Sequence, residues 1–373
     1  MDEKSTNFFD FFKEVPDHRI ERRKLHSVSE ILLLTFCGVV AGCDSWEDIE
    51  DFGKIKLNYL REYFRYEHGA PSDDTLRRFF RSLDPEVFEA CFIKWVKSFQ
   101  LDLEKKVVAV DGKTSRRSFD GTGRPMHLVS AFASELGIVL GQLKTEEKSN
   151  EITAIPELLS LLDIAGAVIT IDAMGCQSKI VEKIVEKEAD YLIGLKGNQG
   201  TLNDDVRLLF DNKPQGTIFQ HAEEYDKGHG RLETRCCTVT ECIDWLKDKH
   251  PQWSNFRSII EIESTREIKG KVTVEKRYYI SSLAAEPKPI LNVVRQHWGI
   301  ENKLHWVLDI TFCDDQSRIR KGNAPRNMAI IKKTVLNLLN IIKKASPRLS
   351  LKRMRKMAGW DNAFLEKILA AEF

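Results

Sequence analysis

The sequence lacks the cysteine spacings that hold a zinc ion or a disulfide framework. Its eight cysteines are scattered along 373 residues, and none forms a CxxC pair or stands at ligand spacing from a histidine. Zinc is therefore not expected. Scattered cysteines of this kind fit a reducing compartment, so we expect a cytoplasmic protein.

Long apolar runs are also missing. The longest, ILLLTFCGVVAG at residues 31–42, is shorter than the roughly 20 residues that a membrane span needs. Ser27 and Ser29 before it and the acidic residues at 44–48 after it mark helix ends, so a buried helix and no membrane partner are expected. The glycines form neither GxGxxG nor a Walker loop, and no small-molecule substrate is expected.

Acidic residues are absent from one long stretch, although the formal net charge is only +1. Between Gln316 and Met357 there is no Asp or Glu, and thirteen Lys and Arg residues lie there. A stretch of one charge sign attracts phosphate. We therefore predict that it contacts DNA, and that Arg318, Arg320 and Lys321 make the contacts. The alternative is a solvated helix face.

The spacing of apolar residues along the sequence divides the chain into four parts. Residues 1–103 have helical spacing, residues 104–199 alternate strands with helices, residues 200–285 alternate like antiparallel strands, and residues 286–373 return to helices. We interpret them as a helical N-terminal domain, the first part of a core, a β-rich insertion, and a core helix followed by a basic helical C-terminus.

The second part has the order of a mixed sheet. VVAVDG, MHLVSAFAS and GIVLGQLKT follow one another as strands, with Gly137 at a tight turn. A helix, the strand AVITIDA, a second helix and the strand DYLIGLKGNQ come next, and this β-α-β order implies parallel strands. The predicted fold class is α/β, a ribonuclease H-like mixed sheet with helices on both faces.

Three carboxylates suggest the chemistry. Asp111 and Asp172 each end an apolar run, and strands lying side by side would bring them together. Glu301 follows much later on a predicted helix, WGIENKLHW. Two strand-end aspartates and a late glutamate suit two Mg²⁺ ions that stabilise an in-line displacement at phosphorus. Taken singly, each aspartate could be an ordinary turn residue.

Several long segments carry a resemblance to a known family. The chain resembles the H repeat-associated transposases, bacterial insertion-sequence enzymes of the DDE type, over nearly its whole length. The segments that carry the resemblance are SEILLLTFCGVVAGCDSWEDIEDFG, VVAVDGKTSR, HLVSAFAS, TEEKSNEITAIPELL, ITIDAMGCQ, YLIGLKGNQG, HGRLETR and HWGIENKLHWVLDITFCDDQSRIRKGNAP.

The resemblance implies that Asp111, Asp172 and Glu301 are the catalytic, metal-binding acids. It implies Mg²⁺-dependent cleavage and strand transfer of double-stranded DNA, with Mn²⁺ as a substitute. Because two transposon ends must be held at once, a homodimer is expected. Two alternatives stay open: a structure-specific nuclease that does not join DNA, and an inactive DNA-binding remnant of a transposable element.

One departure from the wider DDE pattern affects the phosphate contacts. That pattern has Tyr, Arg and Lys at fixed steps around the glutamate, where this chain has Val294, His297 and Leu308. The third acid also has neighbours that could replace it, namely Asp309, Asp314 and Asp315. Besides the three basic residues named above, the residues predicted to contact DNA are Lys113, Arg116, Lys196, Asn198, Arg231, Arg295, His297, Trp298 and Lys303.

Overall fold

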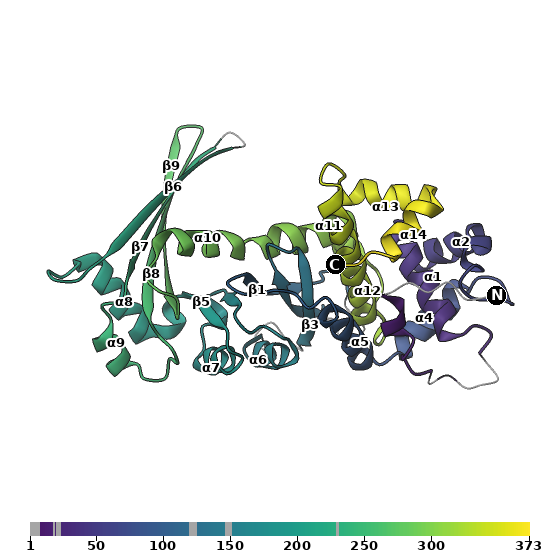
Figure 1. The fold of residues 1–373 in the computed structure, drawn as a ribbon, viewed down its shortest axis with the longest axis horizontal. Helices are drawn as coiled ribbons and strands as arrows, with labels where there is room; N and C mark the ends of the chain where they lie inside the picture. Colours follow the sequence, from purple (N-terminus) through teal and green to yellow (C-terminus); the bar gives the residue numbers. More distant parts are fainter. Residues whose placement is uncertain (1–7, 18, 20–23, 119–124, 146–150, 229–230) are drawn as a thin grey trace.

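One sheet of nine strands, in the order β3-β2-β1-β4-β5-β9-β8-β7-β6, runs from the left end of an elongated molecule to its middle, and the N-terminal and C-terminal helices lie at the other end (Figure 1). The structure is a computed structural model. It describes residues 8–17, 19, 24–118, 125–145, 151–228 and 231–373. The sheet divides into a core half, in which Asp111 lies on β1 and β4 ends just before Asp172, and an inserted half that extends it.

The core half has the direction pattern of a ribonuclease H-like fold. β2 pairs antiparallel with β1 and β3, whereas β4 pairs parallel with β1 and β5. This mixed sheet agrees with the prediction from the sequence. Its elements are β1 (Val107–Thr114), β2 (His127–Ala133), β3 (Ile138–Thr145), α6 (Glu151–Leu161), β4 (Val168–Ile171), α7 (Ser178–Glu186) and β5 (Asp190–Leu195).

Apolar side chains fill both faces of this half because successive strand residues point to opposite sides. Val108 and Ile169 belong to the large core that also contains α6 and α7, which lie below the sheet in Figure 1. Val107 and Val168, one residue away, join a second core with α10 (Pro287–His297) on the other face. The strands are therefore buried on both sides, as parallel strands usually are.

The inserted half continues the same sheet. β9 pairs antiparallel with β5, so the insertion adds its strands to the core sheet edge. Gly270, with φ +78°, makes the predicted turn between β8 and β9. A helix and a strand that we had not predicted, α8 and β6, also lie here. The elements are α8 (Gly200–Asn212), β6 (Gln220–Gly228), β7 (Arg231–Thr240), α9 (Asp244–Lys249), β8 (Ser258–Ile268) and β9 (Lys271–Ser281).

The N-terminal helices begin where the sequence signals placed them. Ser27 caps α1 in a capping box with Glu30, Ser72 caps α4, and Asp84 caps α5. α2 and α3 are separated at Lys56, whose backbone leaves helical geometry (φ −98°, ψ 16°). The elements are η1 (Phe9–Phe12), α1 (Val28–Val40), α2 (Trp46–Ile55), α3 (Leu57–Leu60), α4 (Asp73–Ser82) and α5 (Pro85–Lys97).

The C-terminal helices join the two ends of the chain. α12 packs on β3 and also contacts α1, α4 and α5, so it connects the sheet to the N-terminal helices. Within the described ranges, no helix is both long enough and apolar enough to cross a membrane. After α10 come η6 (Glu301–His305), α11 (Trp306–Thr311), η7 (Asp314–Gln316), α12 (Ala324–Ala345), α13 (Leu351–Trp360) and α14 (Asn362–Leu369).

Candidate active site

Strand register brings the two aspartates to neighbouring positions. The parallel pairing of β1 with β4 ends at Val110 and Ile171, and Asp111 and Asp172 are the next residues on the two strands. β4 stops there, and Asp172 caps the turn η4 (Ala173–Gly175) by accepting the N–H groups of Met174 and Gly175. β1 continues along β2, so Asp111 lies within a strand rather than at its end.

Glu301 reaches the same place from a turn of π-helix. The chain leaves α10, passes through the π-turn η6 and continues as α11. Glu301 is exposed, while His305 at the end of the turn is buried. Nδ1 of His305 lies 3.0 Å from Oε2 of Glu301 and 3.6 Å from Oδ2 of Asp111. One ligand atom from each of these residues lies within 4.8 Å of the others.

The electrostatics of Asp111 indicate a site short of positive charge. Burial raises the pKa of the Asp111 carboxyl to about 7, and the carboxylates of Asp172, Glu151 and Glu301 add to the shift by repulsion. A divalent cation would remove that repulsion, and carboxylate oxygens are the ligands that Mg²⁺ and Mn²⁺ prefer. The donor set of Asp111, Asp172 and Glu301 therefore fits such an ion.

His305 is a poor candidate for a positive charge at this site. Burial lowers the pKa of its imidazole to about 4, against the pull of the Glu301 carboxylate, and Lys333 and Lys113 add to the lowering. A neutral ring leaves the negative charge of Asp111 and Glu301 uncompensated by the histidine.

The three alternative acids are already paired with lysines. Asp309 accepts from Lys113 at 2.6 Å, Asp315 lies 3.5 Å from the same ammonium, and Asp314 lies 2.8 Å from Lys332. Their charge is therefore balanced within the chain, whereas Glu301 lies beside Asp111. Lys113, predicted to contact DNA, is only 12% exposed and is held by these carboxylates.

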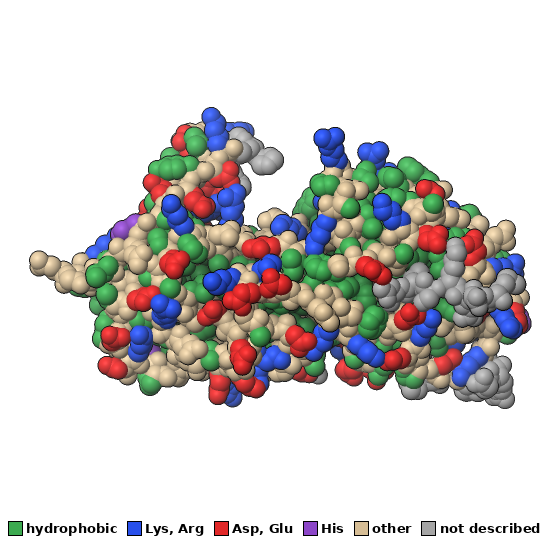
Figure 2. All heavy atoms as spheres, in the orientation of Figure 1, with side chains coloured by type: hydrophobic (Ala, Val, Ile, Leu, Met, Phe, Trp, Pro, Cys, Tyr) green, Lys and Arg blue, Asp and Glu red, His purple; other side chains and the backbone are tan. Residues whose placement is uncertain are grey.

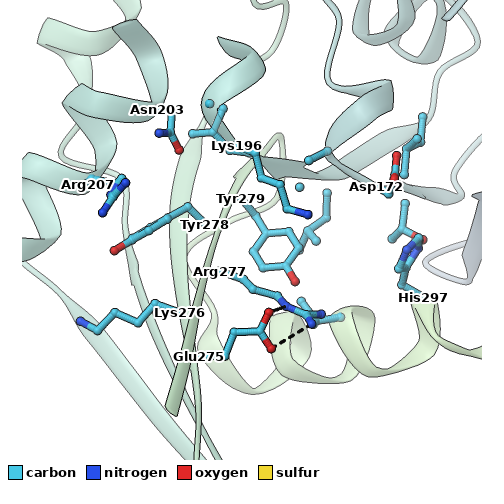
Figure 3. A pocket seen from close by; sticks show the side chains of 18 of the residues that line it. Asp172, Lys196, Asn203, Arg207, Glu275, Lys276, Arg277, Tyr278, Tyr279 and His297 are labelled. Atoms are coloured by element: carbon cyan, nitrogen blue, oxygen red, sulfur yellow. Dashed lines mark hydrogen bonds and ion pairs between the residues drawn. The ribbon is translucent and has the colours of Figure 1, made fainter. Parts of the chain in front are cut away.

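A cavity of about 710 Å³ opens beside Asp172 (Figure 3). The cavity lies between α8 and α10, at the point where β5 ends and its partner strand β9 extends beyond it. Lys196 points into it, and Arg277 stands across from Lys196 in an ion pair with Glu275. His297 closes one side, with Nδ1 3.0 Å from the Thr170 hydroxyl. Such a space with cationic and aromatic walls suits a nucleotide rather than an apolar ligand.

The outer wall of this cavity carries an exposed aromatic. Trp298 is 45% exposed, and the guanidinium of Arg277 lies 5.0 Å from the centre of its ring. Arg207 on α8 and Tyr279 on β9 complete the lining. The sequence singles out Trp298 but not Arg207, Arg277 and Tyr279, because these three lie on a helix and on an inner strand of the sheet whose neighbours only the tertiary fold defines.

Other predicted DNA contacts have partners within the chain. Asn198 donates to the Ala173 carbonyl at 2.7 Å, Lys303 donates to the Ser134 carbonyl at 3.0 Å, and Arg295 pairs with Asp226 at 3.2 Å. Arg116 remains 82% exposed. The side chain of Arg231 lies outside the part of the chain that the structure describes.

The basic stretch is divided between interior and surface. Lys332, Lys333 and Arg355 are buried, so these three residues of the acid-free stretch add no charge to the surface. Arg320 donates to the Arg117 carbonyl at 2.7 Å. The basic residues of the stretch that remain exposed are Arg318, Lys321, Lys344, Arg348, Lys352, Arg353 and Lys356.

Comparison with known proteins agrees with this geometry. The profile described as "Transposase DDE domain" matches residues 102–338, and the "DDE_Tnp_1-associated" profile matches residues 9–96. The chain belongs to the H repeat-associated family of DDE transposases. The family domain covers both aspartates and Glu301, and its associated domain covers the N-terminal helices.

Relatives match the chain over nearly their whole length. "Putative transposase YncI" of Escherichia coli O157:H7 is 41% identical over 98% of this chain and 95% of its own length. "H repeat-associated putative transposase YhhI" of E. coli strain K12 is 40% identical over 95% of this chain and 96% of its own. A cryo-EM structure of the piggyBac transposase synaptic complex with hairpin DNA aligns over 96% of this chain and 76% of its own, with a TM-score of 0.47 and 10% identity.

Proposed function

We propose that this DDE transposase cleaves double-stranded DNA at the ends of an insertion sequence and joins the freed ends to target DNA. Asp111, Asp172 and Glu301 would hold Mg²⁺, with Mn²⁺ as a substitute. One observation supports the proposal: Asp111 and Asp172 follow paired positions on two parallel strands, and Glu301 on the helix lies beside Asp111. The pKa of the Asp111 carboxyl is raised, and His305 supplies no positive charge to balance these carboxylates.

The reaction consists of two displacements at phosphorus. In the first, a water oxygen bonds to phosphorus as the bond to the 3′-oxygen breaks, which leaves a 3′-hydroxyl and a 5′-phosphate. In the second, that 3′-oxygen attacks a target phosphate and displaces the target's own 3′-oxygen. Bound divalent ions would stabilise the charge on the attacking and leaving oxygens. The two aspartates and Glu301 would hold these ions at the reacting phosphate, and the alignment of the attacking and leaving oxygens would follow from their fixed positions.

The shape of the molecule supports a place for the DNA. Figure 2 shows a hollow between the projecting β6–β9 strands and the C-terminal helices, with Lys and Arg side chains on both rims. We propose that duplex DNA lies in this hollow, and that the strand next to the cut passes the cavity lined by Lys196, Arg277 and Trp298. Two copies of the chain would hold the two ends.

Conservative removal of each acid tests the proposal. Asp111→Asn, Asp172→Asn and Glu301→Gln should each lower cleavage of a transposon-end duplex by about a thousandfold or more, because each removes a charged ligand at the reacting phosphate. None of the three variants should melt at a lower temperature than the parent, and gel-shift affinity should change little. Asp190→Asn is the matched control, since Asp190 lies on β5 at the opposite end of the same parallel strands.

Two further outcomes would change the assignment. Activity in Glu301→Gln together with its loss in Asp309→Asn would move the third acid to Asp309. A labelled 3′-end that is cut but never joined to a plasmid would leave a nuclease, and the absence of cleavage with Mg²⁺ or Mn²⁺ would leave a DNA-binding remnant.

A further inference from the structure

The two nitrogens of His305 face different surroundings. Nδ1 lies 3.0 Å from Oε2 of Glu301. Nε2 is buried and has no hydrogen-bond partner among the residues that the structure describes. A buried imidazole nitrogen without a partner is costly, so its position calls for an explanation.

A small cavity behind the ring supplies one. His305, Lys333 and Ser130 are among the residues that line a space of about 10 Å³. A space of this size holds about one water molecule. Lys333 is buried and donates to Ser130 and Gln142, and an ammonium has a further N–H to offer. A water here could donate to Nε2 and accept from Lys333.

The hydrogen at Nδ1 follows from its partner. A carboxylate oxygen only accepts hydrogen bonds, so Nδ1 of His305 must be the donor to Glu301. With the hydrogen on Nδ1, a neutral ring has a lone pair on Nε2, which is the acceptor that the cavity water would satisfy. The surroundings of both nitrogens therefore agree on one tautomer.

The π-turn produces this arrangement. The N–H of Trp306 bonds to the carbonyl of Glu301, five residues back, in place of the usual four. Across this wider turn the Glu301 side chain is 57% exposed, while that of His305 is 6% exposed. In this turn the buried imidazole of His305 donates to the exposed carboxylate of Glu301. π-Turns often occur at functional sites.

We propose that His305 is a positioning residue, whose Nδ1–H fixes the carboxylate of Glu301 for metal binding. The inference rests on the proposed function. His305 acts through Glu301 rather than as a ligand, because Mg²⁺ favours oxygen donors and the ring nitrogen already donates to the acid.

Binding of Mn²⁺ alone, followed by the EPR signal of the free ion, tests the role without any reaction. His305→Ala should weaken Mn²⁺ binding about 10- to 100-fold, as loss of an outer partner of a metal ligand usually does. His305→Asn should retain most of the affinity, since its amide places a donor near Nδ1. His250→Ala is the matched control, because His250 is also buried and bonded to a carboxylate, Asp205 at 3.0 Å.

Each outcome has one meaning when Asp111→Asn is measured beside these variants. If Asp111→Asn loses Mn²⁺ but His305→Ala binds it normally, the positioning role is wrong and the proposed function stands. If neither variant changes binding, the metal site itself is wrong. Equal loss in a folded His305→Asn and in His305→Ala would make the ring nitrogen a ligand, which also overturns the inference.

Discussion

At the scale of single residues, Asp111 links metal binding to stability. Its carboxyl has a pKa near 3.8 when unfolded and about 7 in the folded, metal-free chain. A raised folded pKa contributes stability below pH 4 that is lost as the pH rises towards 7. One pKa unit corresponds to about 1.4 kcal/mol, so the ionised carboxylate costs on the order of a few kcal/mol at pH 8.

Asp111→Asn should therefore raise the melting temperature of the metal-free protein at pH 8 by several degrees, and the gain should shrink to roughly a third of that by pH 5. Mg²⁺ should stabilise the unsubstituted chain at pH 8 and have little effect on the variant. Thermal unfolding in chelator and in Mg²⁺ between pH 5 and 8 measures both. If Asp111→Asn is less stable than the parent at pH 8, the ionised Asp111 carboxylate does not destabilise the metal-free protein and the prediction is wrong.

Not every residue of the site could be predicted from the sequence. The neighbouring positions of Asp111 and Asp172 follow from strand patterning, because parallel strands align their ends. The pairing of Asp309 with Lys113 does not, since it depends on how α11 lies against β1. His305 was visible four residues after Glu301, but nothing in the sequence indicates a π-turn that buries it.

At the scale of elements, two strand-end loops are tied together at the site. Asn198 in η5 (Gly197–Gln199) donates to the carbonyl of Ala173, and Gln199 donates to that of Cys176 at 2.6 Å. These bonds connect the loop after β5 to the loop that begins with Asp172. The position of the Asp172 carboxylate therefore depends on a neighbouring strand.

Asn198→Ala should lower the cleavage rate on the order of tenfold while changing stability by about 1 kcal/mol, because a small displacement of a reacting group costs more in rate than one hydrogen bond contributes to folding. Single-turnover cleavage and urea unfolding measure the two effects. Lys196→Ala distinguishes anchoring of the loop from contact with phosphate, because this substitution should weaken DNA binding rather than lower the cleavage rate of bound DNA. An Asn198→Ala enzyme of normal rate would mean that the loops hold their shape independently.

Predicted and observed elements differ where the apolar pattern is weak. β6 has the sequence QHAEEYDKG and lies at the sheet edge, so it has few buried side chains and no alternation to detect. The missed helix α8 had a signal: Leu202, Val206 and Leu209 are buried at helical spacing. Helix starts were predictable because Ser27, Ser72 and Asp84 cap them locally.

At the scale of the whole molecule, the basic stretch serves both folding and surface charge. Lys332 pairs with Asp314, and Arg355 pairs with Asp44 and lies over the ring of Phe312. These residues join the C-terminal helices to the rest of the chain. The composition of the stretch does not distinguish these buried cations from surface cations, because their acidic partners lie elsewhere in the sequence. The cations that stay exposed on α13 are the ones that we propose attract DNA.

Replacing Lys352, Arg353 and Lys356 by Ala should therefore flatten the dependence of DNA affinity on salt. Each neutralised phosphate contributes about −0.9 to the slope of log affinity against log salt, so the slope should fall in magnitude by roughly two to three units if all three bind. Alanine at Lys179 and Lys183 on α7 and at Lys187, which caps the C-terminus of this helix, is the matched change of charge; α7 lies below the sheet in Figure 1. An equal fall in both triple variants would show that the DNA responds to net charge alone, whereas a fall confined to the α13 variant would place the duplex against the C-terminal rim of the hollow.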